Sequence, residues 1–188
     1  MSDVMKDPGM PDIDSLQEPT MENVEKQILV AGVGNAWMQD DGFGSEAARR
    51  LERRELPPGV TVMDFGSGGL DLAYEIMRGY HALVLIDVSR QGGEPGQLYV
   101  IEPDPADYAR PIEDGEMISP HGMDPQTVLR FVSAVGQFSG KVVVVACEPG
   151  PIEDLAVGLS PEVELAVERA LDLVMEQIAA LRTDDAYR

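Results

Sequence analysis

Four side chains of this sequence could act together in one chemical site: the adjacent carboxylates Asp40 and Asp41, the carboxylate Asp87 and the imidazole His121. The two adjacent aspartates follow the first apolar run of the chain, Asp87 ends a second apolar run, and His121 lies in a long polar segment. Two carboxylates and an imidazole make a three-ligand set for a divalent metal with open positions. Oxygen and nitrogen ligands without a thiolate suit borderline metals such as zinc or nickel, and the residue types do not choose between them.

Each of these aspartates also has an ordinary structural explanation. An aspartate at the start of a helix accepts hydrogen bonds from free backbone N–H groups, and an aspartate after a strand can close an Asx turn. One aspartate is enough for a helix cap, so the second member of the pair has less need to be there. The chemical and the structural explanations both stay open at this point.

Other catalytic groups are scarce in the sequence. The single cysteine, Cys147, ends the apolar run KVVVVAC, which favours a small buried residue over a nucleophile and allows no disulfide within the chain. The nucleophile motif GxSxG and the zinc motif HExxH are both missing. Ser119 lies close to His121 in sequence, but closeness in sequence does not make a triad. His81 precedes a strand on the opposite edge of the sheet and is interpreted as a surface residue.

Apolar strands that alternate with amphipathic helices must position these residues. The pattern predicts an α/β fold, a three-layer sandwich in which helices cover both faces of a twisted, mostly parallel five-stranded sheet with one antiparallel strand. Ser160 and Pro161 are typical of the N-cap and first position of a helix. The expected strands are 28–34, 60–66, 82–88, 96–103 and 141–148, and the expected helices are 44–56, 69–79, 125–137 and 160–181.

The connections predict where the site lies. Right-handed crossovers place the strand 28–34 between the strands 60–66 and 82–88, and ligands bind outside the carboxyl ends of strands at such a switch point. The carboxylates of the first and third strands therefore converge on one crevice. The connection SRQGGEPG is too short for a parallel crossover, so we expect the strand 96–103 to form an antiparallel hairpin with the strand 82–88. The long segment 104–124, which carries His121, must then return to the crevice.

A dinucleotide site is the main alternative for the turn GVGNAW. It would use the two glycines of the turn and a ribose-binding acid, for which Asp64 at the end of the second strand is placed correctly. However, Trp37 stands where a third glycine is expected and would crowd both the helix and the pyrophosphate. The carboxylates of Asp40 and Asp41 would also repel a phosphate at the helix N-terminus. A site that binds a cation is therefore favoured.

Composition narrows the class of protein. The 188 residues include 34 acids and 14 bases, a formal net charge of −20, which repels nucleic acid and anionic lipid. No apolar run approaches the roughly 20 residues of a membrane helix, and the N-terminus lacks the order of a secretory signal. We expect a cytoplasmic monomer with an acidic, disordered tail over 1–27, one domain over 28–182 and a short C-terminal tail over 183–188.

Several motifs occur together in one order: GVGNAWMQDDGFG, DFGSGG, LIDV followed by PGQLYVI, SPHG, and GLSPEV before the last helix. This ordered set resembles the hydrogenase maturation proteases, the endopeptidases of nickel–iron hydrogenase assembly. The resemblance covers roughly 28–182. It departs from the family pattern at Asp41, where glutamate is frequent, and at Phe65 in DFGSGG.

The resemblance implies a nickel-dependent processing endopeptidase without a serine or cysteine nucleophile. Such an enzyme removes the C-terminal peptide of a hydrogenase large-subunit precursor after nickel insertion. Asp41, Asp87 and His121 would hold the nickel carried by the precursor, so the free protein would not bind metal tightly, and Asp40 would assist proton transfer. The alternatives are a nickel-dependent checkpoint protein that binds the precursor without cutting it and, less favoured, a dinucleotide-binding α/β protein.

Overall fold

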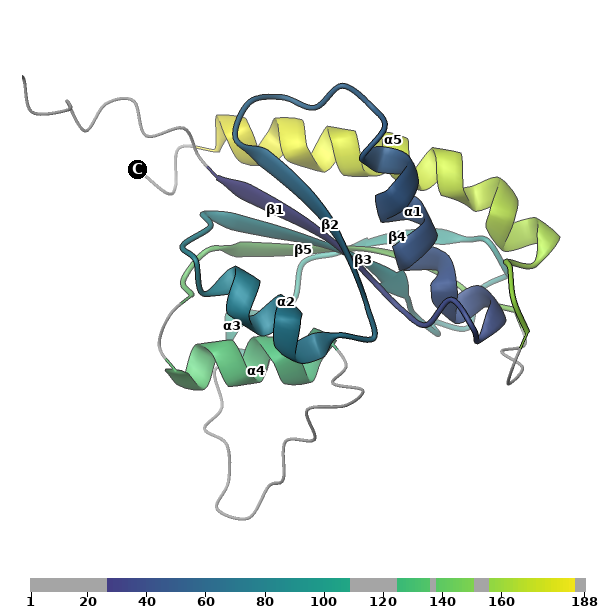
Figure 1. Ribbon diagram of the computed structural model, residues 1–188, viewed down its shortest axis with the longest axis horizontal. Coiled ribbons are helices and arrows are strands. Elements are labelled where there is room, and N and C mark those ends of the chain that lie inside the picture. Colours follow the sequence, from purple (N-terminus) through teal and green to yellow (C-terminus); the bar gives the residue numbers. More distant parts are fainter. Residues whose placement is uncertain (1–26, 109–124, 136–137, 151–155, 185–188) are drawn as a thin grey trace, which may run out of the picture.

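A computed structural model describes residues 27–108, 125–135, 138–150 and 156–184, so residues 1–26 of the expected acidic tail and the last four residues lie outside it. The fold is built on one five-stranded sheet with the order β2-β1-β3-β5-β4, in which only β4 is antiparallel to its neighbour. The predicted placement of the first strand between the second and third is confirmed (Figure 1). The strands are β1 (Ile28–Val33), β2 (Val60–Gly66), β3 (Ala82–Val88), β4 (Leu98–Ile101) and β5 (Lys141–Cys147).

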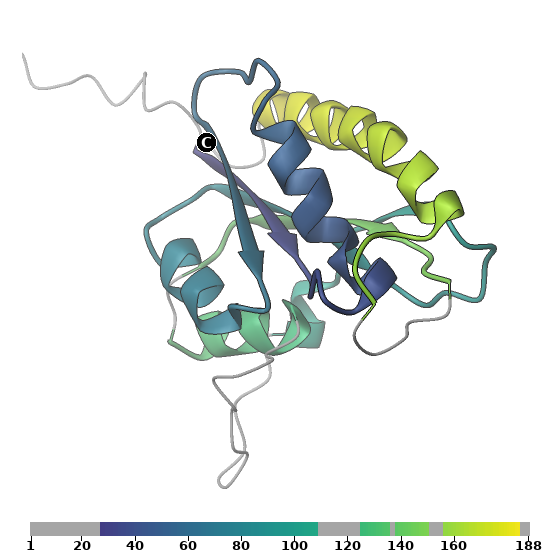
Figure 2. The same cartoon turned by 45° about the vertical axis from the view of Figure 1, so that its right-hand side comes forward.

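Helices cover both faces of this sheet, as the alternating pattern predicts. Helices α1 (Phe43–Leu51) and α5 (Pro161–Thr183) lie on one face, and α2 (Gly69–Ile76), α3 (Pro105–Tyr108) and α4 (Pro125–Val135) lie on the other (Figures 1 and 2). A short 3₁₀ turn, η3 (Gln39–Gly42), leads from β1 into α1. The three-layer α/β architecture is thus confirmed.

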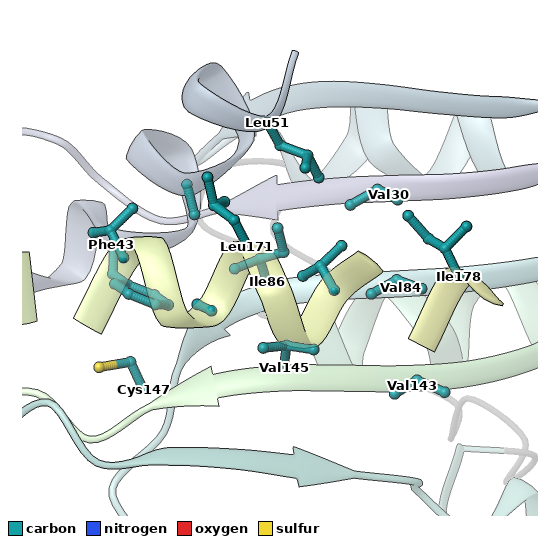
Figure 3. Packing of buried hydrophobic residues seen from close by; sticks show 14 of the residues in the cluster. Val30, Phe43, Leu51, Val84, Ile86, Val143, Val145, Cys147, Leu171 and Ile178 are labelled. Atoms are coloured by element: carbon teal, nitrogen blue, oxygen red, sulfur yellow. The ribbon is translucent and has the colours of Figure 1, made fainter. Parts of the chain in front are cut away.

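The core consists of two apolar layers, one on each side of the sheet. Side chains alternate along each strand, so Val30 and Val84 pack toward α1 and α5 whereas Leu29 and Leu83 pack toward α2 and α4. Figure 3 shows the first layer, in which β-branched residues of three strands meet leucine and isoleucine side chains of the two helices. Strands β1 and β3 are apolar on both faces because both faces are covered.

The expected hairpin between the third and fourth strands is wrong in its pairing. Strand β4 does turn back against the parallel direction, but it pairs with β5 in the register Leu98↔Cys147, and β5 lies between it and β3. Strand β5 takes the free edge of β3 because its apolar residues need cover on both faces, which only an interior strand receives. The more exposed β4 suits the edge of the sheet. The connection 89–97 is long enough to cross the end of β5, because neighbouring strands are only about 4.8 Å apart.

Smaller differences concern the ends of the elements. Helix α1 ends at Leu51 rather than at residue 56, and the short helix α3 was not expected from the sequence. The buried ring of Tyr108 in α3 joins the apolar layer beneath α2 and α4. Across the described ranges, no helix combines the length and the apolar character needed to cross a membrane.

Candidate active site

The turn from β1 into α1 is packed tightly against the carboxyl ends of two strands. A side chain at Gly44 would overlap the carbonyl oxygens of Val33 and Ile86, so only glycine lets the start of α1 touch both β1 and β3. Gly34 has a φ of +133°, a region that favours glycine, and a Cβ there would overlap the carbonyl oxygen of Asp41. The glycines of this motif therefore serve backbone packing, and they bring η3 against the end of β3.

Asp41 lies in η3 at this edge. Its side chain is half-buried, and its Oδ2 accepts a hydrogen bond of 2.9 Å from the backbone N–H of Asn35. Its own backbone N–H donates to the carbonyl of Met38 at 3.1 Å. This bond leaves Oδ1 as the second oxygen of the carboxylate that a cation could use.

Asp87 is the second-last residue of β3 and is half-buried. Its Oδ1 accepts a hydrogen bond of 2.8 Å from the backbone N–H of Val88. Strand β3 pairs with β1 up to Gly32↔Ile86, so Asp87 follows directly on the residue that packs against Gly44. Asp41 and Asp87 are thus brought to the carboxyl ends of neighbouring parallel strands, at the switch point that the sequence predicts.

Asp40 faces a different environment from that of Asp41. It is fully buried, and its carboxylate accepts three hydrogen bonds: from the backbone N–H of Gly150 at 2.9 Å, the backbone N–H of Ser160 at 2.6 Å and the hydroxyl of Ser160 at 2.8 Å. These contacts occupy both carboxylate oxygens. The geometry favours a structural role for Asp40 over the proton transfer expected for it.

His121, the third predicted ligand, lies outside the described residues. Within the residues that are described, no cluster of three or more histidine, cysteine, aspartate or glutamate side chains could hold a metal ion. His81 precedes β3 at the amino edge of the sheet, opposite the crevice, as predicted. It is half-buried rather than fully at the surface, and its Nδ1 accepts a long hydrogen bond of 3.4 Å from the backbone N–H of Gln27.

The same turn is unsuited to a dinucleotide. Asp64, the candidate ribose-binding acid, pairs with Arg49 at 3.1 Å and accepts a hydrogen bond from the backbone N–H of Gly66. Trp37 does not crowd the helix as expected, because α1 begins six residues later and the indole is 68% exposed. Gly44 takes over the close helix–strand contact instead. The space that a pyrophosphate would need before the helix is filled by η3 and its two aspartates.

Comparison with known proteins decides the family. A family model described as Hydrogenase maturation protease matches residues 45–177, which is more than half of the chain. The chain belongs to the hydrogenase maturation protease family. A curated member, the Hydrogenase 2 maturation protease of Escherichia coli, is 31% identical over 157 residues, or 83% of this chain and 91% of that protein.

Solved structures of other maturation proteases share the fold. The hydrogenase maturating endopeptidase HybD of E. coli superposes with a TM-score of 0.66 at 30% identity, covering 82% of this chain and 93% of that one. The hydrogenase 2 maturation peptidase of a Thaumarchaeota archaeon gives a TM-score of 0.63 at 31% identity, covering 82% and 99%. Membership in this family confirms the resemblance seen in the sequence and makes the protein a peptidase, a hydrolase of peptide bonds.

The single thiol of the chain is the one cysteine nucleophile that this protease could use. Cys147 is fully buried at the end of β5, within the apolar layer shown in Figure 3. Burial, and then the nearby negative charge of Asp40, raise the pKa of this thiol to about 12. A buried, protonated thiol is not a nucleophile at neutral pH. The sequence-based interpretation of Cys147 as a small core residue is confirmed.

One buried acid of the maturation protease was missed in the sequence. Glu148 is only 5% exposed, and it accepts hydrogen bonds from the backbone N–H groups of Gln91 and Gly92 and from the hydroxyl of Tyr99. Burial acts to raise its pKa, but the hydrogen bonds from Gln91, Tyr99 and the glycines outweigh burial, so the pKa lies below its ordinary value. Its only signal in the sequence is an acid directly after a buried apolar strand, which is shared by Asp87.

Proposed function

We propose that this maturation protease removes the C-terminal peptide from the precursor of a nickel–iron hydrogenase large subunit once nickel has been inserted. The family model and the names of the relatives support a hydrogenase as the target. The nickel is part of the substrate, because it travels with the precursor. It serves as the mark that distinguishes a precursor ready for cleavage from one that is not.

One observation carries this proposal: Asp41, in the turn after β1, and Asp87, near the end of the parallel neighbour β3, are both half-buried and lie at the same edge of the sheet. Hard and borderline cations prefer such oxygen ligands. The net charge of −20 also attracts a substrate that carries a cation. In contrast, the single thiol of the chain is buried and protonated.

In the proposed mechanism, Asp41, Asp87 and His121 coordinate the nickel of the precursor from one side. The role of His121 rests on the family resemblance. Three ligands leave coordination positions open, which the precursor itself fills, so the free protease holds no metal tightly. The coordinated nickel would hold the scissile segment in place. It would also polarise the peptide carbonyl or activate a water molecule for attack. Cytoplasmic location and a monomeric state stay predictions.

The test is the intact mass of the precursor, nickel-loaded or nickel-free, after incubation with the protease. We expect a defined C-terminal peptide to be lost only from the nickel-loaded form. Asp87→Asn and His121→Ala should abolish this loss, whereas Glu176→Gln, a matched removal of one exposed charge on α5, should not. Processing by either site variant at the wild-type rate contradicts the assignment. Tight binding of the loaded precursor without any cleavage would instead indicate the checkpoint alternative.

A further inference from the structure

We infer that Asp40 is a positioning residue: through Ser160 and Gly150 it fixes the turn that presents Asp41 to the substrate. The role of Asp41 in this inference rests on the proposed function. The contacts of Asp40 are independent of it, and they join η3 to two residues that lie 110 and 120 positions further along the chain.

The carboxylate of Asp40 connects η3 to both ends of the segment between β5 and α5. Oδ2 accepts hydrogen bonds from the N–H of Gly150, just after β5, and from the hydroxyl of Ser160, just before α5. Oδ1 accepts a third hydrogen bond from the backbone N–H of Ser160. Hydrogen bonds to a charged acceptor are about twice as strong as neutral ones, and burial of the group strengthens them further. We call this set of three bonds the Asp40 clasp.

The hydroxyl of Ser160 is used for the clasp instead of for its own helix. Ser160 is the N-cap of α5 and Pro161 follows it, as the sequence predicts, yet the side chain makes no capping hydrogen bond. A serine at this position normally accepts a bond from a backbone N–H in the first turn. Here it donates to Asp40 across 120 residues of sequence. The loss of this hydroxyl should therefore affect η3 rather than α5.

The clasp acts directly on the residue next to it. Asp41 follows Asp40 in the same 3₁₀ turn, so rotation of one peptide unit moves both side chains. A further bond ties the other end of the turn, from the backbone N–H of Gln39 to the carbonyl of Ala156 at 2.6 Å. Asn35 then holds Oδ2 of Asp41 from inside the turn. The position of the Asp41 carboxylate is thus set by the bonds of Gln39 and Asp40 and by its own bond to Asn35, in the way that outer residues orient metal ligands.

The first test compares Ser160→Ala with Ser160→Thr. Both variants keep the backbone N–H of residue 160, but only threonine keeps the hydroxyl that donates to Asp40. Hydrogen exchange is measured at the amide of Asn35, whose N–H is bonded to Asp41. We expect exchange about ten-fold faster in Ser160→Ala, wild-type exchange in Ser160→Thr, and unchanged exchange in the middle of α5. Unchanged exchange at Asn35, or faster exchange confined to α5, overturns the inference.

The second test measures function by a ratio that general destabilisation does not change. The affinity for nickel-loaded precursor is divided by that for nickel-free precursor, so any loss of folded protein cancels. We expect Ser160→Ala to lower this ratio about ten-fold and Ser160→Thr to restore it. In an Asp41→Asn background Ser160→Ala should lower it no further, because both changes act on the same ligand. An unchanged ratio in Ser160→Ala, or an additive loss in the double variant, contradicts the inference.

The two tests separate the inference from the proposed function. A wild-type ratio of one would mean that nickel is not recognised, which would contradict the proposed function. The exchange measurement at Asn35 does not depend on nickel or precursor, and it would still decide whether the clasp controls the surroundings of Asp41.

Discussion

Two loops at the carboxyl edge of the sheet are each held by one buried carboxylate, and the two carboxylates serve different purposes. Asp40, fully buried, ties the turn η3 to Gly150 and Ser160. Glu148, 5% exposed, ties residues 89–97 to the end of β5 through Gln91 and Gly92, and it also accepts a bond from Tyr99 of β4. Both loops lie beside the proposed active site, yet only η3 contains one of its acids.

The difference lies in how each site acid obtains its position. Asp87 belongs to β3 and is registered with Ala146 of β5, so the sheet itself fixes its backbone. Asp41 lies in a turn, where no strand ladder holds the chain, and a buried side chain next to it takes over that task. Glu148 holds the connection that follows Asp87 without having to place a site residue. A side-chain clasp is needed for positioning only where backbone pairing ends.

The largest expected effect comes from the acid that the Asp40 clasp presents. Asp41→Asn removes a charged ligand while keeping its shape, and we expect processing to fall by about 100-fold or more, at the upper end of what metal-site substitutions cost. The side chain is half-buried and an amide oxygen can still accept the bond from Asn35, so the urea midpoint should stay near the wild-type value. Mass spectrometry of the nickel-loaded precursor measures the rate. A drop of less than about three-fold would exclude Asp41 as a ligand.

A smaller loss of activity is expected when the clasp itself is weakened. Asp40→Asn places an amide group against the N–H of Gly150 or the N–H of Ser160, so at least one buried donor loses its acceptor. Processing per folded molecule should fall about ten-fold, and urea unfolding should show a loss of about 1–3 kcal/mol. If stability falls but processing per folded molecule stays at the wild-type level, the Asp40 clasp only stabilises the fold, as we expect of the hydrogen bonds to Glu148.

Glu148→Gln is the matched change in the other loop. We expect lower stability at neutral pH, because Gln91, Gly92 and Tyr99 lose a charged acceptor. Processing per folded molecule should stay within about two-fold of wild type, which corresponds to a very small change in activation free energy. Thermal unfolding and the precursor assay, run on one preparation, measure both. A large loss of processing would show that residues 89–97 also place a site residue and would remove the contrast.

The stability that Glu148 contributes should also depend on pH. The pKa of Glu148 is lowered from its ordinary value of 4.5, so its contribution to stability is complete above that pH and is lost as the pH falls through the lower, folded-state value. Wild-type protein should therefore lose thermal stability below about pH 4.5 more steeply than Glu148→Gln. Melting curves between neutral pH and pH 3 compare the two. Parallel curves would contradict the assigned direction of the shift.

The smallest effect on activity is expected for the thiol of Cys147, which lies near the carboxylates of Asp40 and Glu148. Cys147→Ala should leave processing within about two-fold of wild type, because a thiol with a pKa of about 12 supplies no thiolate at neutral pH. The small cavity should cost about 1 kcal/mol of unfolding free energy. In the native wild type, iodoacetamide should not modify Cys147 until denaturant is added. Rapid native modification, or loss of processing, would restore the thiol as a nucleophile.

Much of the framework could be predicted from local pattern. The bounds of β2 and β3 agree with the expected 60–66 and 82–88, and the order of the first three strands follows from right-handed crossovers. The position of Asp87 at a strand end follows from the same periodicity. The pairing of β4 was missed because a short connection shows that a strand turns back, but not which strand lies beside it.

What the sequence determined by itself was therefore local: apolar period, turn residues, helix start signals, and carboxylates at the ends of two strands. Only the tertiary structure decided which member of the pair Asp40 and Asp41 is buried, that Gly44 makes the helix–strand contact, and that the hydroxyl of Ser160 bonds to Asp40. The physical reason is separation along the chain. A periodic pattern can be recognised from a few neighbouring residues. The partners of Asp40, in contrast, lie 110 and 120 residues away and contact it only when the helices pack on the sheet.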